Sequence, residues 1–276
     1  MEYNAVIFDQ SMYFLPIFFI TFALCLVLFF GTYINTQKGI FYLDVQHKVL
    51  ALVEILFLLS IMLLFINGWN LGFGFANTFS THPSTILVQI VICSFSLGIT
   101  LISKKYLHQE KINIFEYHIL VVLSSLGLIC LVASETFMSV FLSIELQSLS
   151  FYVLASIFLR SDYSTEAGLK YFVLGAVATC FMLFGFSCIY GFTGSCNFDD
   201  IFFILYGSNE ILSNSSFIVL TASASLIIAS LLFKIAAVPF HFWAPDVYEG
   251  SPTGVTAFFA TVPKIAIFFL LLKLIL

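Results

Sequence analysis

Charged residues are scarce in this sequence. Only 9% of its 276 residues are Asp, Glu, Lys or Arg, whereas 61% are hydrophobic and the mean hydropathy is +1.09. A soluble globular protein is about one quarter charged, so this composition excludes a soluble fold. The apolar runs are long and continuous, which excludes the short alternating strands of a transmembrane barrel. We therefore expect an all-α polytopic membrane protein, because a spanning helix satisfies its own backbone hydrogen bonds.

The sequence motifs that hold redox cofactors and metals are also missing. The 6 cysteines contain no C-x-x-C pair, and the 5 histidines show neither H-x-x-E-H nor H-E-x-x-H spacing. An iron–sulfur cluster needs several convergent thiolates. The stretch "GFGF" at Gly72 to Phe75 lacks the third glycine of a dinucleotide-binding loop. We expect no cofactor, no metal and no nucleic acid to be bound by this chain.

The N-terminal stretch "MEYNAVIFDQ" is acidic, whereas secretory and organellar leader peptides are basic. No cleavable leader is therefore expected. The 35 phenylalanines are typical of an AT-rich organellar genome, although phenylalanine also suits a lipid environment.

Eight apolar stretches are long enough to cross a bilayer, which takes about 20 residues. They are Tyr13–Ile34, Val49–Ile66, Ser84–Ser103, Tyr117–Ala133, Thr136–Leu159, Ala167–Tyr190, Phe217–Trp243 and Thr253–Ile275. The longest connections run from Gly68 to Pro83 and from Gly191 to Ser216. We expect one membrane domain and no soluble module.

The basic residues predict how the chain is oriented. Six of the 10 lysines and arginines fall in the connections after the odd-numbered spans, namely Lys38, Lys48, Lys104, Lys105, Lys111 and Arg160. The positive-inside rule places these connections on the cytoplasmic or matrix side, and hence the N-terminus on the opposite side. Trp69 and Trp243 lie at span ends, where interfacial aromatic residues are expected.

The other four lysines and Glu145 fall within the predicted spans. Lys170 and Lys273 lie near span ends, so that their side chains can reach the interface. Lys234, Lys264 and Glu145 lie near the middle of the membrane. An ionisable group there costs about 3 kcal/mol or more, so these three residues require an explanation.

Two interpretations of the buried charges compete. A structural ion pair between Glu145 and one lysine leaves the second lysine unexplained. A proton or ion path accounts for both lysines, because a lysine gains or loses its proton as a carboxylate partner moves nearer or further away. His241 is a further titratable group that could extend this path.

The stretch "FKIAAVPFHFWAPDVYEGSPTG", Phe233 to Gly254, predicts a broken helix. Pro239 has no backbone N–H and clashes with the preceding turn, and the span 217–243 is too long for one straight crossing. We expect the break between Lys234 and Phe240. Asp246 and Glu249 follow the break, where solvation of a surface loop is favoured over proton collection.

Four stretches carry a resemblance to a known family. "SIELQSLSFYVLAS", "STEAGLKYFVLGA", "FKIAAVPFHFWAPDVYEGSPT" and "PKIAIFF" resemble subunit 2 of respiratory NADH:ubiquinone oxidoreductase (complex I), an antiporter-like membrane subunit. The resemblance implies a proton-translocating subunit without redox chemistry of its own, in the mitochondrial inner membrane with its N-terminus toward the intermembrane space. It implies that NADH, FMN, iron–sulfur clusters and ubiquinone are bound by other subunits. The other membrane-arm subunits of complex I, and lipids such as cardiolipin, would be its partners.

The same resemblance implies a role for each charged position. Glu145 matches the carboxylate of the fifth span, Lys170 the lysine of the sixth, and Lys234 the lysine of the broken helix. Lys264 matches a lysine that links toward the neighbouring channel. Together with His241 they form the implied proton relay.

The chain departs from the family in one respect. The family carries two inverted five-helix repeats, whereas this sequence holds a three-helix segment, 1–115, and only the first repeat, 116–276, with its broken helix at 217–243. We expect a split gene in which a separate chain supplies the second repeat. Two alternatives to the complex I interpretation stay open: a cation/proton antiporter subunit, and a structural membrane element with an inactive half-channel.

Overall fold

Long helices build almost the whole chain. The computed structural model describes residues 14–37, 42–67, 72–74, 77–109, 114–158, 161–207 and 214–275. Its elements are α2 (Leu15–Gln37), α3 (Tyr42–Asn67), β1 (Gly72–Gly74), β2 (Phe79–Thr81), α4 (Pro83–Gln109), α5 (Glu116–Ala133), α6 (Phe137–Ala155), α7 (Asp162–Thr193), α8 (Phe198–Gly207), α9 (Asn214–Ile235), α10 (Ala244–Gly250) and α11 (Thr253–Ile275). In this part of the chain, 8 helices are long and apolar enough to cross a membrane. The predicted all-α architecture with eight spans is confirmed.

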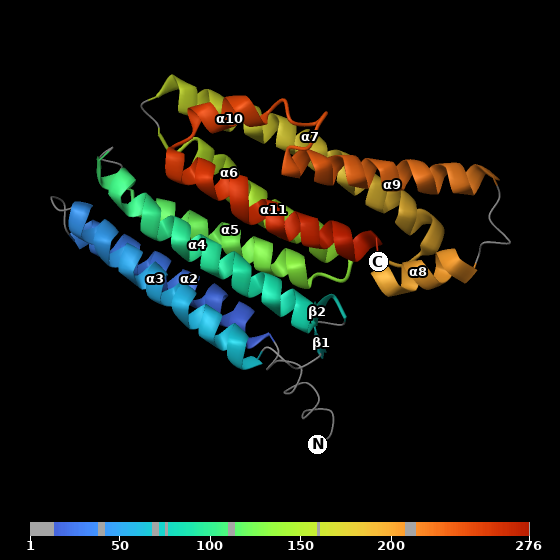
Figure 1. The fold of residues 1–276 in the computed structure, drawn as a ribbon, viewed down its shortest axis with the longest axis horizontal. Helices are drawn as coiled ribbons and strands as arrows, with labels where there is room; N and C mark the ends of the chain where they lie inside the picture. Colours follow the sequence, from blue (N-terminus) through green and yellow to red (C-terminus); the bar gives the residue numbers. More distant parts are fainter. Residues whose placement is uncertain are drawn as a thin grey trace, which may run out of the picture.

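The helices run side by side along one common direction (Figure 1). Helices α2 and α3 form one edge of the bundle, and α4 packs between α3 and α11. Helix α5 is central, in contact with α2, α4, α6 and α11, and α7 lies along α6, α9 and α10. We call the end of the bundle that carries Lys48, Lys104 and Lys105 the basic end, and the opposite end, where β1 and β2 pair, the hairpin end.

Small residues allow two of the helix pairs to approach closely. A Cβ on Gly127 of α5 would lie 2.9 Å from the backbone nitrogen of Gln147 on α6. A Cβ on Gly185 of α7 would lie 2.9 Å from the carbonyl oxygen of Ser223 on α9. Glycine at both positions brings the helix backbones together, which is the main source of attraction between helices in lipid.

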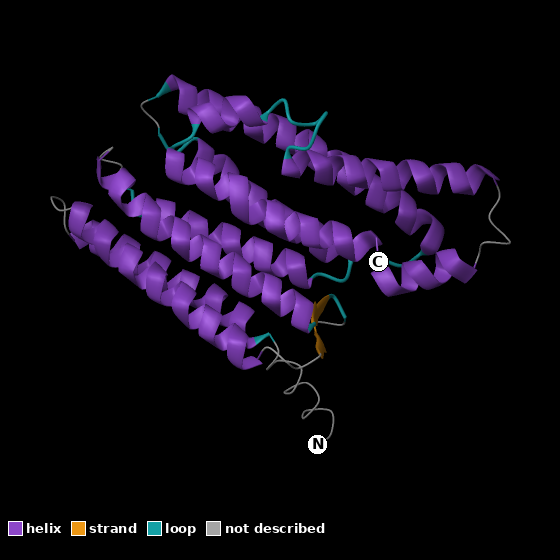
Figure 2. Ribbon diagram, viewed as in Figure 1, coloured by secondary structure: helices purple, strands orange, loops and turns teal. Residues whose placement is uncertain are grey.

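Three segments join at the hairpin end. Strands β1 and β2 pair antiparallel with Gly72 opposite Thr81. Phe79 pairs further with Ser134 in the α5–α6 connection, and Thr136 of the same connection pairs with Asn197 before α8. The two connections predicted to be the longest therefore contain a hairpin and a short helix, as Figure 2 shows.

Several spans differ in length from the sequence-based prediction, and two of them carry residues of the candidate site. Helix α7 begins at Asp162 rather than Ala167, because the Ser161 side chain accepts a hydrogen bond from the Ser164 backbone N–H and caps the helix. Helix α9 ends at Ile235 and does not continue to Trp243. The sixth span is thus longer than predicted and the seventh is shorter.

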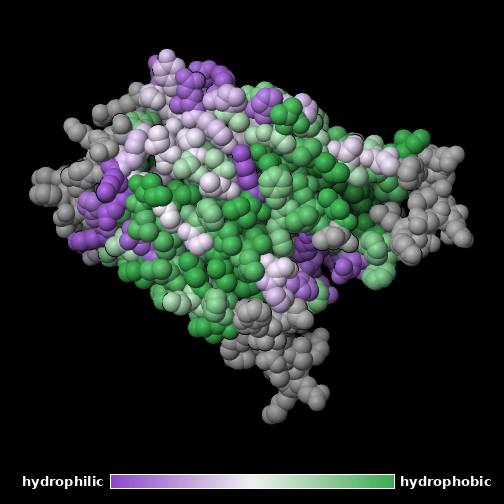
Figure 3. Space-filling model, viewed as in Figure 1, coloured by the Kyte–Doolittle hydropathy of each residue, from purple (hydrophilic) through white to green (hydrophobic). Residues whose placement is uncertain are grey.

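The surface suits a lipid environment. Apolar residues cover most of the face seen in Figure 3, and hydrophilic residues gather toward its rim. Large side chains such as Phe22 and Phe29 are exposed. Inside the bundle, buried serines donate hydrogen bonds to their own helix, as Ser124 does to the carbonyl of Val121. Such bonds let polar side chains lie within the membrane without unpaired hydroxyl groups.

Candidate functional site

Helix α9 ends inside the bundle. Its end lies part-way along α7, and an irregular connection leads from there to α10 (Figures 1 and 2). Ala236 has a left-handed backbone, with φ of 61°, and the N–H of Ala237 donates to the carbonyl of Leu232 at 3.0 Å. This is the hydrogen bond that commonly closes a helix C-terminus. The predicted break is confirmed, with Pro239 in the connection just after it.

Trp243 fixes the path of the chain after the break. Its indole Nε1–H donates to the carbonyl of Phe233 in the last turn of α9, at 2.9 Å. Its ring stacks on Tyr171 of α7, with centroids 4.7 Å apart and an interplanar angle of 11°. Only 3% of Trp243 is exposed, which differs from the exposed position expected of an interfacial tryptophan, because the indole packs against α7 and the end of α9. Trp69 lies outside the described residues.

Lys234 is the buried charge at the end of α9. Only 7% of the residue is exposed, and within the described chain its Nζ has no hydrogen-bond partner. Its Nζ lies over the ring of Tyr152 on α6, 5.8 Å from the ring centroid. The charge that acts on Lys234 through space is that of Glu145, which is half-buried on the same helix as Tyr152. No ion pair joins the two among the described interactions, so the amine is buried without a fixed polar partner.

Lys170 is placed quite differently. Its Nζ forms ion pairs with Glu166, one turn earlier on α7, at 2.8 Å and with Asp246 of α10 at 2.6 Å. All three side chains are substantially exposed, near the basic end of the bundle. Asp246 therefore has a specific partner as well as solvation. Tyr248, on the same short helix, packs on Trp243, and its burial raises the pKa of its phenol above the ordinary value.

The other two predicted relay residues are not part of this cluster. Lys264 is half-buried on α11, directly after Pro263 within the helix. His241 is exposed on the connection after α9. The described contacts join neither of them to Lys234 or to Glu145. The structure therefore brings Lys234 and Glu145 into one neighbourhood and leaves Lys170, Lys264 and His241 at separate places.

An ion pair at the hairpin end was not predicted. Lys273 near the end of α11 contacts Glu135 at 2.7 Å and donates to the carbonyl of Ser134 at 2.7 Å. Glu135 also accepts a hydrogen bond from the Ser80 hydroxyl of β2. The side chains of Lys273 and Glu135 are 18% and 14% exposed. That the Lys273 side chain can reach the interface stays a prediction, and in the structure a carboxylate at the same end of the bundle binds it. In the sequence, the position of Glu135 just beyond a predicted span was the one feature that could have indicated this ion pair.

Two further buried titratable residues also escaped sequence analysis. His118 on α5 is fully buried, and neither ring nitrogen has a hydrogen-bond partner in the described part of the chain. Glu54 on α3 buries one carboxylate oxygen, which likewise has no described partner. Among the described residues, no three His, Cys, Asp or Glu side chains gather as metal ligands would.

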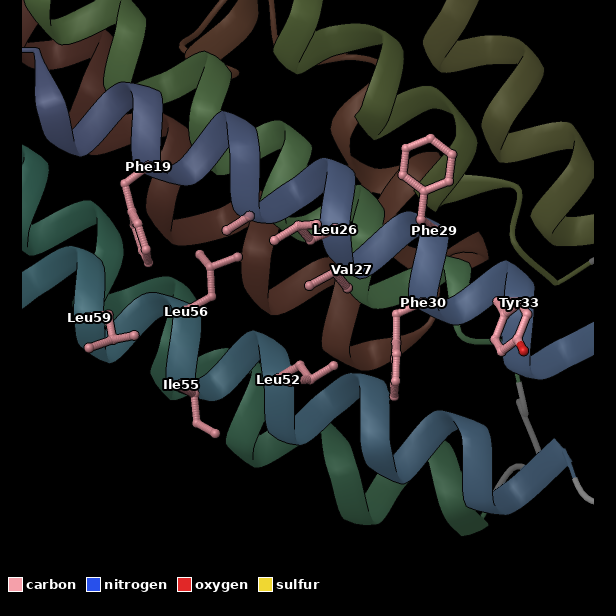
Figure 4. Close-up of a pocket in the computed structure, with 11 residues that line it drawn as sticks. Phe19, Leu26, Val27, Phe29, Phe30, Tyr33, Leu52, Ile55, Leu56 and Leu59 are labelled. Atoms are coloured by element: carbon pink, nitrogen blue, oxygen red, sulfur yellow. The ribbon is translucent and has the colours of Figure 1, made fainter.

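An apolar groove lies between α2 and α3 (Figure 4). It has a volume of about 680 Å³ and includes Phe19, Val27 and Leu56 in its lining. No charged residue lines it, so it suits a hydrocarbon chain rather than a polar ligand.

Comparison with known proteins gives consistent matches. The family described as NADH:quinone oxidoreductase/Mrp antiporter, TM matches residues 134–276. NADH-ubiquinone oxidoreductase chain 2 of Marchantia polymorpha is 38% identical over 256 residues, which is 91% of this chain and 52% of that protein. A chain of respiratory complex I from Thermus thermophilus with bound aureothin aligns with a TM-score of 0.75 at 25% identity, over 94% of this chain and 52% of its own length.

A more distant match extends the structural similarity. A chain of the Mrp complex from Dietzia sp. has a TM-score of 0.67 at 19% identity, over 94% of this chain and 48% of its own length, and so shares the fold. The chain described here spans about half the length of the relatives it matches.

Proposed function

Because the chain belongs to the NADH:quinone oxidoreductase/Mrp antiporter family of transmembrane proteins, we propose that it is a proton-translocating subunit in the membrane arm of complex I. The observation that carries this proposal is Lys234, a buried amine at the end of a broken helix, with no hydrogen-bond partner among the described residues. Burying an unpaired charge is costly. In membrane proteins such residues mark ion and proton pathways.

The chemistry follows from the placement of Lys234 and Glu145. The ammonium form of Lys234 is favoured when the Glu145 carboxylate is close, and the neutral amine is favoured when the carboxylate moves away or takes up a proton. Each such cycle lets the amine receive one proton and release it. Because α9 ends at Ile235, backbone groups of the connection at this depth must line protein or water, which provides an approach to the amine.

The remaining predicted relay residues enter the proposal with separate parts. Lys170, exposed and paired with Glu166 and Asp246, would act at the mouth of the path on the basic end. Lys264 on α11 would pass charge toward a neighbouring unit, and His241 would act near the exposed side of the break. We also propose that 116–276 forms one five-helix repeat, preceded by the three-helix segment 1–115.

The setting of the chain is proposed from its relatives. The chemistry of NADH, FMN, iron–sulfur clusters and ubiquinone would take place in other subunits, and this chain would act as a translocase without a cofactor of its own. It would lie in the mitochondrial inner membrane, with the basic end toward the matrix and the N-terminus toward the intermembrane space, as the positive-inside rule favours.

The proposed partners are the other membrane-arm subunits and lipid. Since the relatives are about twice as long, a second repeat would pack against this one. We predict that a separate chain supplies this second repeat. The masses of the polypeptides in the purified complex test this prediction. Lipid acyl chains fit the uncharged groove between α2 and α3. A cardiolipin headgroup would need cationic residues, which do not occur in that lining.

The sequence leaves two alternative functions open, a cation/proton antiporter subunit and a structural element with an inactive half-channel. A cation/proton antiporter subunit has the same fold, but the similarity to the Mrp chain is 19% identity, whereas the relative named for NADH-ubiquinone oxidoreductase is 38% identical. Co-purification with NADH dehydrogenase activity separates these two functions. If the chain were a structural element with an inactive half-channel, substitution of Lys234 would not change proton pumping.

The test is proton pumping by the assembled complex in sealed membrane vesicles, with NADH oxidation recorded in parallel. Lys234→Met and Glu145→Gln each remove a titratable group at nearly constant size, and we expect both to lower pumping at least about tenfold, the scale of 1.4 kcal/mol or more in the rate-limiting barrier. Lys105→Ala, an exposed basic residue of α4, is the control and should pump normally. Normal pumping by both Lys234→Met and Glu145→Gln would refute the proposed function.

A further inference from the structure

Tyr152 lies on the helix of Glu145 and contacts the Lys234 ammonium with its ring. It follows Glu145 by two helical turns on α6, so the two residues share one face of that helix. The Lys234 ammonium lies over its ring, with 5.8 Å between Nζ and the ring centroid. One aromatic side chain therefore connects the helix of the carboxylate with the helix of the amine.

The place of the Tyr152 ring is tightly determined. Its edge meets the ring of Tyr171 at 5.0 Å and that of Phe172 at 5.5 Å, both on α7. Tyr171 is itself stacked on Trp243, which binds the last turn of α9. The ring is thus fixed by the same aromatic cluster that holds the end of the broken helix.

The hydroxyl of Tyr152 is held against α7. A Cβ on Gly175 would lie only 2.2 Å from this oxygen, so any larger residue at 175 must displace the tyrosine. On its own helix the oxygen approaches Ser148, without a hydrogen bond of good geometry in the described chain. Glycine at 175 therefore leaves room for a tyrosine at this position.

We propose that Tyr152 is a positioning residue for proton transfer: its ring face holds the Lys234 ammonium within reach of the Glu145 charge. The face of an aromatic ring is negative and attracts a cation, most strongly where water is excluded. Among the described residues Nζ has no hydrogen-bond acceptor, so the contact with the ring stabilises the charged lysine. Its attraction is weaker than that of an ion pair with a carboxylate, so the ring does not hold the ammonium permanently. The inference rests on the proposed function and adds to it the group that sets the geometry of the exchange.

The first test separates the ring from the hydroxyl in the assembled complex in sealed vesicles. Tyr152→Phe keeps the ring face and should retain most of the pumping, whereas Tyr152→Leu removes it and should lower pumping per assembled complex about fivefold, as expected for a partly desolvated cation–π contact. The amount of assembled complex is measured for each variant, because a purely structural role would reduce assembly rather than pumping per complex. Equal pumping by Tyr152→Leu and the unchanged protein would overturn the proposal.

The second test moves the ring without altering it. Gly175→Ala places a methyl group against the Tyr152 hydroxyl, so pumping should fall, and adding Tyr152→Phe should restore part of it by removing the clashing oxygen. Gly191→Ala on the same helix is the matched control, since a Cβ there meets nothing within 4 Å. Full pumping by Gly175→Ala would contradict the positioning role.

These tests also distinguish this inference from the proposed function. If Lys234→Met abolishes pumping while Tyr152→Leu and Gly175→Ala pump normally, the relay stands and the role of Tyr152 is refuted. If Lys234→Met itself pumps normally, the proposed function fails, and the role of Tyr152 fails with it.

Discussion

Lys234 and Lys273 are both lysines in the last turns of membrane-spanning helices, yet their surroundings differ. Lys273 at the hairpin end has a carboxylate and a backbone carbonyl within 2.7 Å of its Nζ. Lys234 is more deeply buried and has an aromatic ring at 5.8 Å, with no hydrogen-bond partner in the described chain. The Lys273 amine is therefore fixed by short polar contacts, whereas the described chain offers no such contact to the Lys234 amine.

This difference separates a structural charge from a mobile one. A lysine fixed to a carboxylate keeps its proton, because the ion pair would lose its attraction if the amine became neutral. Its contribution is to join α11, the α5–α6 connection and β2. A buried lysine without such a partner is costly in its charged form, and under the proposed function movement of Glu145 changes its protonation. The two lysines therefore predict opposite responses to substitution.

The largest effect on stability is expected at Lys273. Lys273→Met leaves Glu135 without its cation, and removal of one member of a mostly buried pair should lower the free energy of unfolding by about 2 kcal/mol. Thermal unfolding of the purified complex measures this change. Pumping per assembled complex should stay close to that of the unchanged protein, because the ion pair holds the helix end and carries no proton.

Two comparisons sharpen this prediction. Lys105→Ala, an exposed position on α4, should change stability by less than about 0.5 kcal/mol. Combining Lys273→Met with Glu135→Gln should recover part of the lost stability, since no unpaired charge then remains. If Lys273→Met lost pumping while its thermal unfolding matched that of the unchanged protein, this lysine would also take part in proton transfer. The contrast with Lys234 would then not hold.

A smaller effect is expected at Lys170. Its two ion pairs are exposed to solvent, and such pairs contribute little to stability. Lys170→Ala should leave thermal unfolding unchanged and lower pumping less than about twofold, and raising the salt concentration should erase the difference because surface charges are screened. Initial pumping rates at two salt concentrations measure this. A tenfold loss of pumping would place Lys170 within the transfer path rather than at its mouth.

Much of the fold could be predicted from the sequence, because apolar length and charge are local properties. The eight spans and the end of α9 before Pro239 follow from hydropathy and from the missing proline N–H. Charge scarcity also singled out Lys234 and Glu145, since a buried charge in a membrane protein is conspicuous. Helix ends were less accurate, as the Ser161 cap that lengthens α7 shows.

The arrangement around these charges could not be predicted, because it depends on how the helices rotate and pack. Nothing near Trp243 in the sequence indicates that its indole is buried against α7 and the end of α9. The pairing of Lys273 with Glu135 joins residues far apart in the chain. Tyr152 was missed for the same reason, since its importance depends on the end of α9 lying against α6 and α7.

The measurement that tests the central claim most directly compares Lys234→Arg with Lys234→Met. Arginine keeps the positive charge but does not release its proton in proteins, whereas methionine removes the charge altogether. If Lys234 works by gaining and losing a proton, both variants should assemble, and both should lose pumping at least about tenfold, the scale of 1.4 kcal/mol or more in the barrier. Pumping retained by Lys234→Arg and lost by Lys234→Met would show that a permanent positive charge is sufficient, and would contradict the account.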